Sequence, residues 1–157
     1  MNRSLSCILV LVLLFCFYAC SSKVPLDRSG MQAKNVLAVL NDMSKFYETK
    51  NLNSFTSNMS ERYVDRESFS NSLASLFTKY EAIHFKIYHT KMLIVIQENG
   101  QIKVSCNWDA EWFTSGGTSQ KGGGRVTFIF EQNTTKLLAI EGPNPFIPIE
   151  RPIRPQT

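Results

Sequence analysis

The side chains in this sequence that could carry out chemistry are few, and their spacing separates most of them. His84 and His89 are five residues apart, so on a regular strand they point to opposite faces and cannot share a metal ion. Cys106 alternates with Val104 and Trp108, and in that setting a free cysteine usually behaves as a small buried hydrophobic group. A nucleophilic pair of Cys106 with His89 is the alternative. The sequence therefore predicts no catalytic residue, no metal site and no cofactor.

The segment that positions these residues is a run of strict alternation over residues 102–114, IKVSCNWDAEWFT. Every second side chain is apolar and those between are mostly polar, which predicts a long β-strand with one buried face. Asp109 and Glu111 fall on the polar, solvent-facing side, so the buried face carries no acid. Trp108 and Trp112 lie about 13 Å apart on the buried face, from the rise of a strand. They either pack in the core or line an apolar ligand cavity.

The first twenty residues have the pattern of an export signal. An apolar run at residues 8–15 follows Arg3, and residues 17–22, FYACSS, resemble a bacterial lipobox. The resemblance implies removal of residues 1–19 and attachment of lipid to Cys20, which would tie the protein to a membrane. Ser21 in place of aspartate favours the outer membrane in a Gram-negative cell. The alternative is an ordinary signal peptide and a secreted, soluble protein.

Length and composition suit one globular domain behind this leader. The chain has 157 residues and a net charge of +4 scattered along its length, which does not suggest nucleic-acid binding. Three of the four cysteines lie within the first 20 residues, so no disulfide framework is expected. We predict a lipidated cysteine and tether over residues 20–32, a folded domain over 33–147 and a proline-rich tail over 148–157.

Hydrophobic periodicity changes along the domain. Apolar residues at three- and four-residue spacing predict helices over residues 33–49 and 65–80, with a short helix or turn between them at 51–59. Alternating runs predict strands at 83–89, 92–97, 102–114, 125–131 and 136–142. The glycine-rich segment 116–124 lacks the spacing of a phosphate-binding loop and is predicted to be a flexible hairpin loop. The fold class is α+β, with helices packed on an antiparallel sheet.

The pairing of two of these strands depends on the Asn99-Gly100 turn. A two-residue type I′ turn there pairs Val95 with Val104. This register puts three large apolar side chains on the outer face of the sheet, beside polar neighbours. They are Met92, Ile94 and Ile96. Either another element of the chain covers them or a partner does, and a second copy of the chain would make a homodimer.

The order of elements resembles the nuclear transport factor 2-like superfamily. The specific points are the helix at residues 36–47, the aromatic strand at 108–112, and FIF at 128–130 leading into IEG at 140–142. The resemblance implies a cone-like roll in which a strongly curved sheet wraps the long N-terminal helix and leaves a cavity at the open end. The residues of this chain expected to line that cavity are Trp108, Trp112, Cys106, Phe85 and Tyr47.

That superfamily includes isomerases, dehydratases, transport factors and noncatalytic binding modules, so fold alone does not give function. We favour a noncatalytic domain, displayed on a membrane, that binds a protein partner or an apolar small molecule. The alternative is an isomerase- or dehydratase-like enzyme, which would need a carboxylate or histidine buried in the cavity. Many members pair through the outer faces of their sheets, and the resemblance therefore implies a possible homodimer.

Overall fold

The computed structural model describes residues 27–148. The predicted signal peptide, the Cys20 lipidation site and most of the tail lie outside these residues. The elements in chain order are α2 (Arg28–Glu48), α3 (Leu52–Ser57), α4 (Arg66–Lys79), β1 (Ala82–Ile96), β2 (Gln101–Phe113), β3 (Ser119–Glu131) and β4 (Leu137–Glu141). The strands form one antiparallel sheet in the order β1-β2-β3-β4. The predicted α+β class is therefore confirmed.

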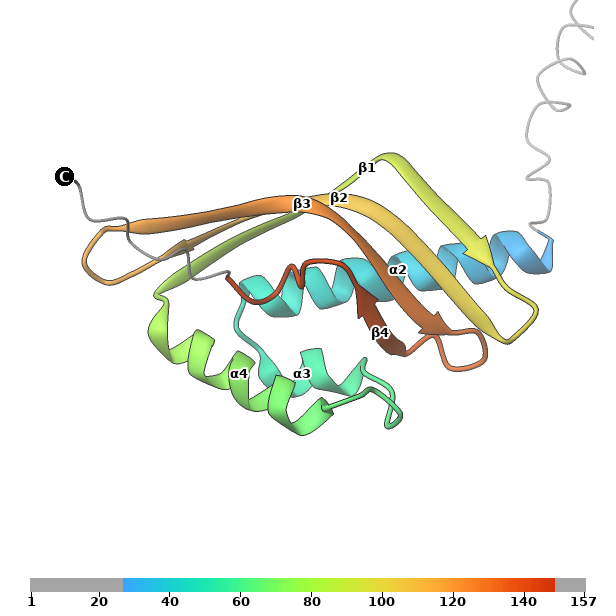
Figure 1. Cartoon of the computed structure of the whole chain (residues 1–157), viewed down its shortest axis with the longest axis horizontal. Helices are drawn as coiled ribbons and strands as arrows, with labels where there is room; N and C mark the ends of the chain where they lie inside the picture. Colours follow the sequence, from blue (N-terminus) through green and yellow to red (C-terminus); the bar gives the residue numbers. More distant parts are fainter. Residues whose placement is uncertain (1–26, 149–157) are drawn as a thin grey trace, which may run out of the picture.

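The sheet arches over the long helix α2, while α3 and α4 lie further from the long strands (Figure 1). Helix α2 buries a stripe at spacings of four, three and four residues, formed by Val36, Leu40, Met43 and Tyr47. It begins five residues before the predicted start because Asp27 caps it, accepting a hydrogen bond of 2.7 Å from the Gly30 N–H. Among residues 27–148, no helix is long and apolar enough to cross a bilayer.

The predicted pairing of β1 with β2 is wrong by one residue. Ile94 pairs with Val104 and Val95 with Lys103. The loop has three residues, 98–100, because Gln97 N–H bonds to the Gln101 carbonyl at 2.8 Å and Gly100 takes a positive φ of 78°. A slip of one residue turns every side chain to the other face.

The corrected register moves the predicted dimer face. Met92, Ile94 and Ile96 lie on the inner face, partly buried and packed against the core. They therefore form no outer apolar patch. Leu93 and Val95 face outward instead, with 54% and 42% of their surfaces exposed. The three inward side chains gain apolar contact that the predicted register denied them, which is a physical reason for the observed pairing.

The glycine-rich segment is mostly strand. Residues 119–124 belong to β3, so the prediction of a flexible loop is wrong for them. The actual turn is short, with Thr114 N–H bonded to the Thr118 carbonyl at 2.9 Å. Gly122 pairs with Ala110, and a Cβ atom there would come within 2.9 Å of the Trp112 indole. Glycine therefore leaves room for a tryptophan on the inner face.

Candidate functional site

The inner face of the sheet is closed by a chain of hydrogen bonds. The Trp112 indole N–H donates to the Tyr47 hydroxyl at 2.7 Å, and that hydroxyl donates to the Phe146 carbonyl at 2.7 Å. All three residues are fully buried. Burial raises the pKa of Tyr47 well above its ordinary value, so the hydroxyl keeps its proton and acts as a donor. These two hydrogen bonds tie the C-terminal segment, at Phe146, to the end of α2, at Tyr47.

The Phe146 ring fills the space under the arch. Its centroid lies 4.9 Å from that of Phe55, 5.1 Å from that of Tyr47 and 5.2 Å from that of Phe85. These distances are typical of favourable aromatic pairs. Phe146, from the proline-rich C-terminal segment, thus packs against Tyr47 and Phe85, two of the residues that the resemblance placed around a cavity. A lone aromatic residue among prolines was a weak sequence signal for this role.

The five residues predicted to line a cavity all lie on the inner side of the arch. Trp108, Trp112, Cys106, Phe85 and Tyr47 are each at most 6% exposed and belong to the core. Burial raises the pKa of the Cys106 thiol to about 11, so it is protonated at neutral pH and a poor nucleophile. The Trp108 indole N–H is buried and has no hydrogen-bond partner in the described part of the chain. Within residues 27–148, the buried set contains no Asp, Glu or His.

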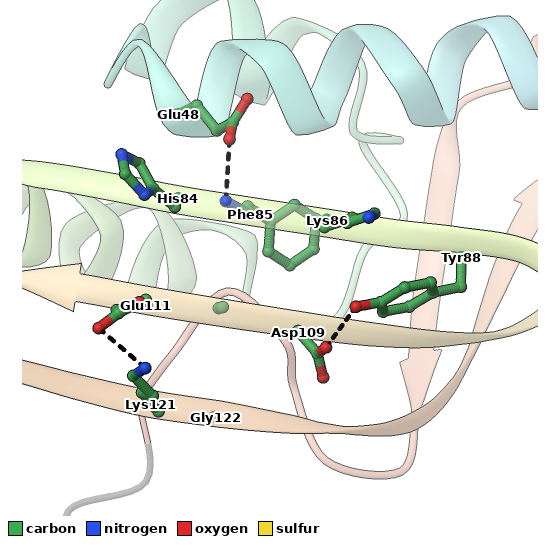
Figure 2. Close-up of a pocket in the computed structure, with 10 residues that line it drawn as sticks. Glu48, His84, Phe85, Lys86, Tyr88, Asp109, Glu111, Lys121 and Gly122 are labelled. Atoms are coloured by element: carbon green, nitrogen blue, oxygen red, sulfur yellow. Dashed lines mark hydrogen bonds and ion pairs between the residues drawn. The ribbon is translucent and has the colours of Figure 1, made fainter.

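An open groove of about 650 Å³ crosses the outer face of the sheet, from α2 over β1 and β2 to β3 (Figure 2). The strand register builds it from three cross-strand rows. Phe85, Ala110 and Gly122 form the middle row; the side chains of Phe85 and Ala110 point to the inner face, and a Cβ atom at Gly122 would do the same. The flanking rows are His84, Glu111 and Lys121 on one side and Lys86, Asp109 and Gly123 on the other. Sequence reasoning placed Asp109 and Glu111 on the outer face, but not beside these neighbours.

The carboxylates of the groove are held in place by donors. Asp109 Oδ2 accepts from the Tyr88 hydroxyl at 2.6 Å, and Glu48 Oε1 accepts from the Phe85 N–H at 2.9 Å (Figure 2). Glu111 Oε1 accepts from the Ser119 hydroxyl at 2.7 Å, which is the main reason its pKa is lowered. The hydrogen bond to Asp109 raises the pKa of Tyr88. The carboxylates of the groove are therefore oriented by hydrogen bonds while they stay accessible to solvent.

Gly123 gives Asp109 its position. A Cβ atom at Gly123 would lie 2.5 Å from Asp109 Oδ1 and 3.2 Å from the Trp108 carbonyl oxygen. The carboxylate therefore occupies the space above the glycine, at the β3 end of its row. The sequence alone does not show which side chain the glycines at 122–124 make room for, because that depends on the partner strand and its register.

The positive groups stand at the edges of the groove. Lys86 Nζ lies 4.9 Å from the centroid of the Tyr88 ring, a cation–π contact. Lys121 Nζ lies 3.4 Å from Glu111 Oε1, and the lysine side chain is 75% exposed. Among the described residues, no group of three or more potential ligands is placed to hold a metal ion. The arrangement suits the binding of a polar group and provides no activated nucleophile.

A further polar cluster, away from the groove, is structural. The Glu131 carboxylate accepts from the hydroxyls of Ser60 and Thr134, each at 2.6 Å, and pairs with the Arg62 guanidinium at 2.8 Å. The Ser60 hydrogen bond, followed by those from Thr134 and Arg62, lowers the pKa of Glu131 to about 2. Through these bonds the carboxylate joins the segment after α3 to the β3–β4 turn.

Comparison with known proteins adds to this geometry. No protein-family model matches the sequence, and no curated protein matches it. Solved structures do match. A nuclear transport factor 2-like superfamily protein from Salmonella enterica aligns over 71% of this chain and 89% of its own, with 8% identity and a TM-score of 0.61. The chain has the nuclear transport factor 2-like fold.

Two other solved structures that match this chain have names that describe unrelated roles. A candidate scytalone dehydratase from Novosphingobium aromaticivorans aligns over 80% of this chain and 98% of its own, with 10% identity and a TM-score of 0.65. The helical cell shape determining protein Pgp2 from Campylobacter jejuni aligns over 76% of this chain and 43% of its own, with 18% identity and a TM-score of 0.58. At these identities the likeness is one of fold alone.

Proposed function

We propose that this protein is a membrane-anchored, noncatalytic binding module of the cell envelope, whose outer sheet face contacts a partner protein. The observation that carries the proposal is the contrast between the two faces. Under the arch, Phe146 and its aromatic neighbours fill the space with packed rings. The groove on the outer face is open and is lined by oriented charged side chains.

The anchor in this proposal is lipid on Cys20, inferred from the lipobox-like segment at residues 17–22. Cells grown with labelled palmitate test it. We expect label on the full chain and none on a Cys20→Ala variant, because that sulfur is the expected attachment atom. Cys16→Ala is the matched control and should keep the label. Palmitate retained on the Cys20 variant would remove the anchor from the proposal.

The partner in this proposal contacts the groove, and site-specific cross-linking in cells tests that contact. A photo-reactive amino acid at position 121, on the rim of the groove, should give a discrete cross-linked species. The same group at position 136, an exposed lysine of the β3–β4 turn, is the matched control. Equal cross-linking at both positions, or none at 121, would contradict a partner on the outer face.

A second copy of the chain is one candidate partner. The predicted homodimer face is turned inward, but Leu93 and Val95 leave some apolar surface outside. Sedimentation velocity of the detergent-extracted protein separates the two cases, because a homodimer doubles the protein mass of the sedimenting species. We expect a monomer, since two exposed aliphatic side chains are few for a stable interface.

The alternative function is an enzyme of the isomerase or dehydratase kind. The feature that favours it is the Trp112–Tyr47 donor pair under the arch, which points a hydroxyl at a carbonyl oxygen. Such an enzyme also needs a base, and the buried residues of the described chain include no carboxylate or imidazole. Binding without catalysis therefore fits the arrangement better.

A further inference from the structure

We infer that the outer groove receives a basic side chain, a lysine or arginine presented by the partner protein. The inference rests on the proposed function and adds to it the chemistry of the contact. It starts from the balance of charge. Three carboxylates line the groove, from Glu48, Asp109 and Glu111, against the two ammonium groups of Lys86 and Lys121. The groove is thus locally acidic in a chain whose net charge is +4.

The two kinds of charge also differ in freedom. The Glu48 and Asp109 carboxylates are each fixed by a donor from β1, the Phe85 N–H and the Tyr88 hydroxyl. Lys121 is mostly exposed on a flexible stem and can swing away without losing a buried contact. The oriented carboxylates therefore attract an incoming cation, whereas they would repel an incoming anion.

Asp109 has one carboxylate oxygen that can accept a further hydrogen bond. Asp109 uses Oδ2 to accept from Tyr88, whereas Oδ1 lies above Gly123. No hydrogen bond to Oδ1 is made from within residues 27–148. An ammonium or guanidinium group that approaches Asp109 from the open side of the groove could donate to Oδ1. Charge-assisted bonds of this kind are about twice as strong as neutral ones.

The shape of the groove fits the stem that carries such a group. The two flanking rows lie two residues apart along each strand, about 7 Å between Cα atoms, and the middle row between them turns its side chains away from the groove. Between them the middle row offers Phe85, Ala110 and Gly122, which present no charged group. The Tyr88 ring stands beside Asp109 and already holds one ammonium group, that of Lys86. It can hold an incoming cation in the same way.

The experiment uses the full chain in detergent and observes small probes by saturation-transfer NMR, which detects weak binding. The first probe is N-acetyl-lysine methylamide, and its matched control is N-acetyl-norleucine methylamide, which has a similar stem without the charge. We expect saturable binding of the lysine probe and at least tenfold weaker binding of the norleucine probe. Affinity for lysine should fall as salt rises from 50 to 500 mM, because the contact is ionic.

Variants locate the contact. Asp109→Asn should weaken lysine binding about fivefold or more, and Glu48→Gln should weaken it as well while keeping an acceptor for the Phe85 N–H. Glu141→Gln is the control, since Glu141 lies on the same outer face but pairs with Lys103 outside the groove. Circular dichroism establishes that each variant is folded, and should Asp109→Asn fail to fold, Glu48→Gln decides the question.

Three results would overturn the inference: equal binding of norleucine, unchanged lysine binding in the groove variants, or preferred binding of N-acetyl-glutamate methylamide. The cross-linking at position 121 is an independent readout of the proposed function. If that cross-link persists while the lysine probe does not bind, the binding module stands and the basic side chain is wrong. If both are lost, the outer face is not the contact surface.

Discussion

The two faces of the sheet come from the same strands and follow opposite rules. On β2, Trp108 and Trp112 turn inward into a closed aromatic core, while Asp109 and Glu111 turn outward into an open charged groove. On the inner face polar atoms are few, and the Tyr47 hydroxyl gives both the Trp112 N–H and the Phe146 carbonyl a hydrogen-bond partner. Outside, the carboxylates are held by donors and stay accessible. The period of two in a strand is thus enough to separate a packed apolar face from an accessible charged face.

Two adjacent glycines of β3, Gly122 and Gly123, also serve opposite faces of the sheet. Gly122 faces the inner side and makes room for the Trp112 indole, whereas Gly123 faces the outer side and makes room for the Asp109 carboxylate. A buried ring cannot move without disturbing the core, but an exposed carboxylate can rotate. The same substitution at neighbouring positions should therefore have unequal effects, and each face offers a matched pair of variants.

The largest contrast should come from removing a phenylalanine on each face. Phe146→Ala empties the centre of the arch and should lower the free energy of unfolding by about 3–5 kcal/mol. Phe113→Ala, on the half-buried outer side, should cost about 1 kcal/mol. Urea titrations followed by tryptophan fluorescence measure both. Equal costs would mean that Phe146 is not part of the folded core.

Alanine at the two glycines gives the next contrast. Gly122→Ala places a methyl group against the Trp112 indole and should cost about 1–3 kcal/mol, the usual range for overpacking. Gly123→Ala should cost about 1 kcal/mol, because Asp109 can rotate once it gives up the exposed hydrogen bond from Tyr88. Only the contact of the new methyl group with the Trp108 carbonyl oxygen, at 3.2 Å, then remains to be relieved. Thermal melts of the two variants decide between these values. A larger loss for Gly123→Ala would reverse our assignment of the faces.

Hydroxyl removal compares one tyrosine from each face. Tyr47→Phe leaves the Trp112 N–H and the Phe146 carbonyl without partners in the core and should cost about 1–3 kcal/mol. Tyr88→Phe removes an exposed hydrogen bond to Asp109 and should cost about 0.5 kcal/mol or less. The difference between the two free energies of unfolding is the measurement. A difference near zero would show that water reaches the Tyr47 site.

The last prediction concerns Glu131, which lies at the end of β3, away from the groove, and makes no contrast between the faces. Its pKa falls from 4.5 to about 2 in the folded protein, so it stabilises the fold fully above pH 4.5. That contribution is lost as the pH falls from 4.5 toward 2, because the unfolded chain takes up the proton first. Glu131→Gln should lower stability by about 1–2 kcal/mol at pH 7. It should also flatten this part of the stability curve, which unfolding at several pH values measures.

Much of the fold follows from periodicity alone. The buried stripe of α2 and the inward tryptophans of β2 are visible in the spacing of apolar residues, because burial imposes that spacing directly. The β1–β2 register was not visible, since Gly100 serves a three-residue loop as well as it serves a two-residue one. That one choice decided on which face Met92 and its apolar neighbours lie.

The candidate site was harder to predict than the fold. The groove depends on cross-strand neighbours such as Asp109 and Gly123, which lie 14 positions apart in the chain and meet only through the β2–β3 pairing. The sequence shows which charged residues lie on the outer face of a strand, but not whether they cluster with charged residues of neighbouring strands. Phe146 is apolar within a proline-rich segment, which predicts that it pins this segment to the domain, as the structure confirms, but a single residue has no period that would show where it packs.

The hydrogen bond between Tyr47 and Phe146 spans 99 positions of the sequence. The segment up to Phe146 must therefore be synthesised before the central ring can pack against Tyr47 and complete the core. If the protein is exported as proposed, such late closure would let the chain cross a translocation channel unfolded and complete its core on the far side.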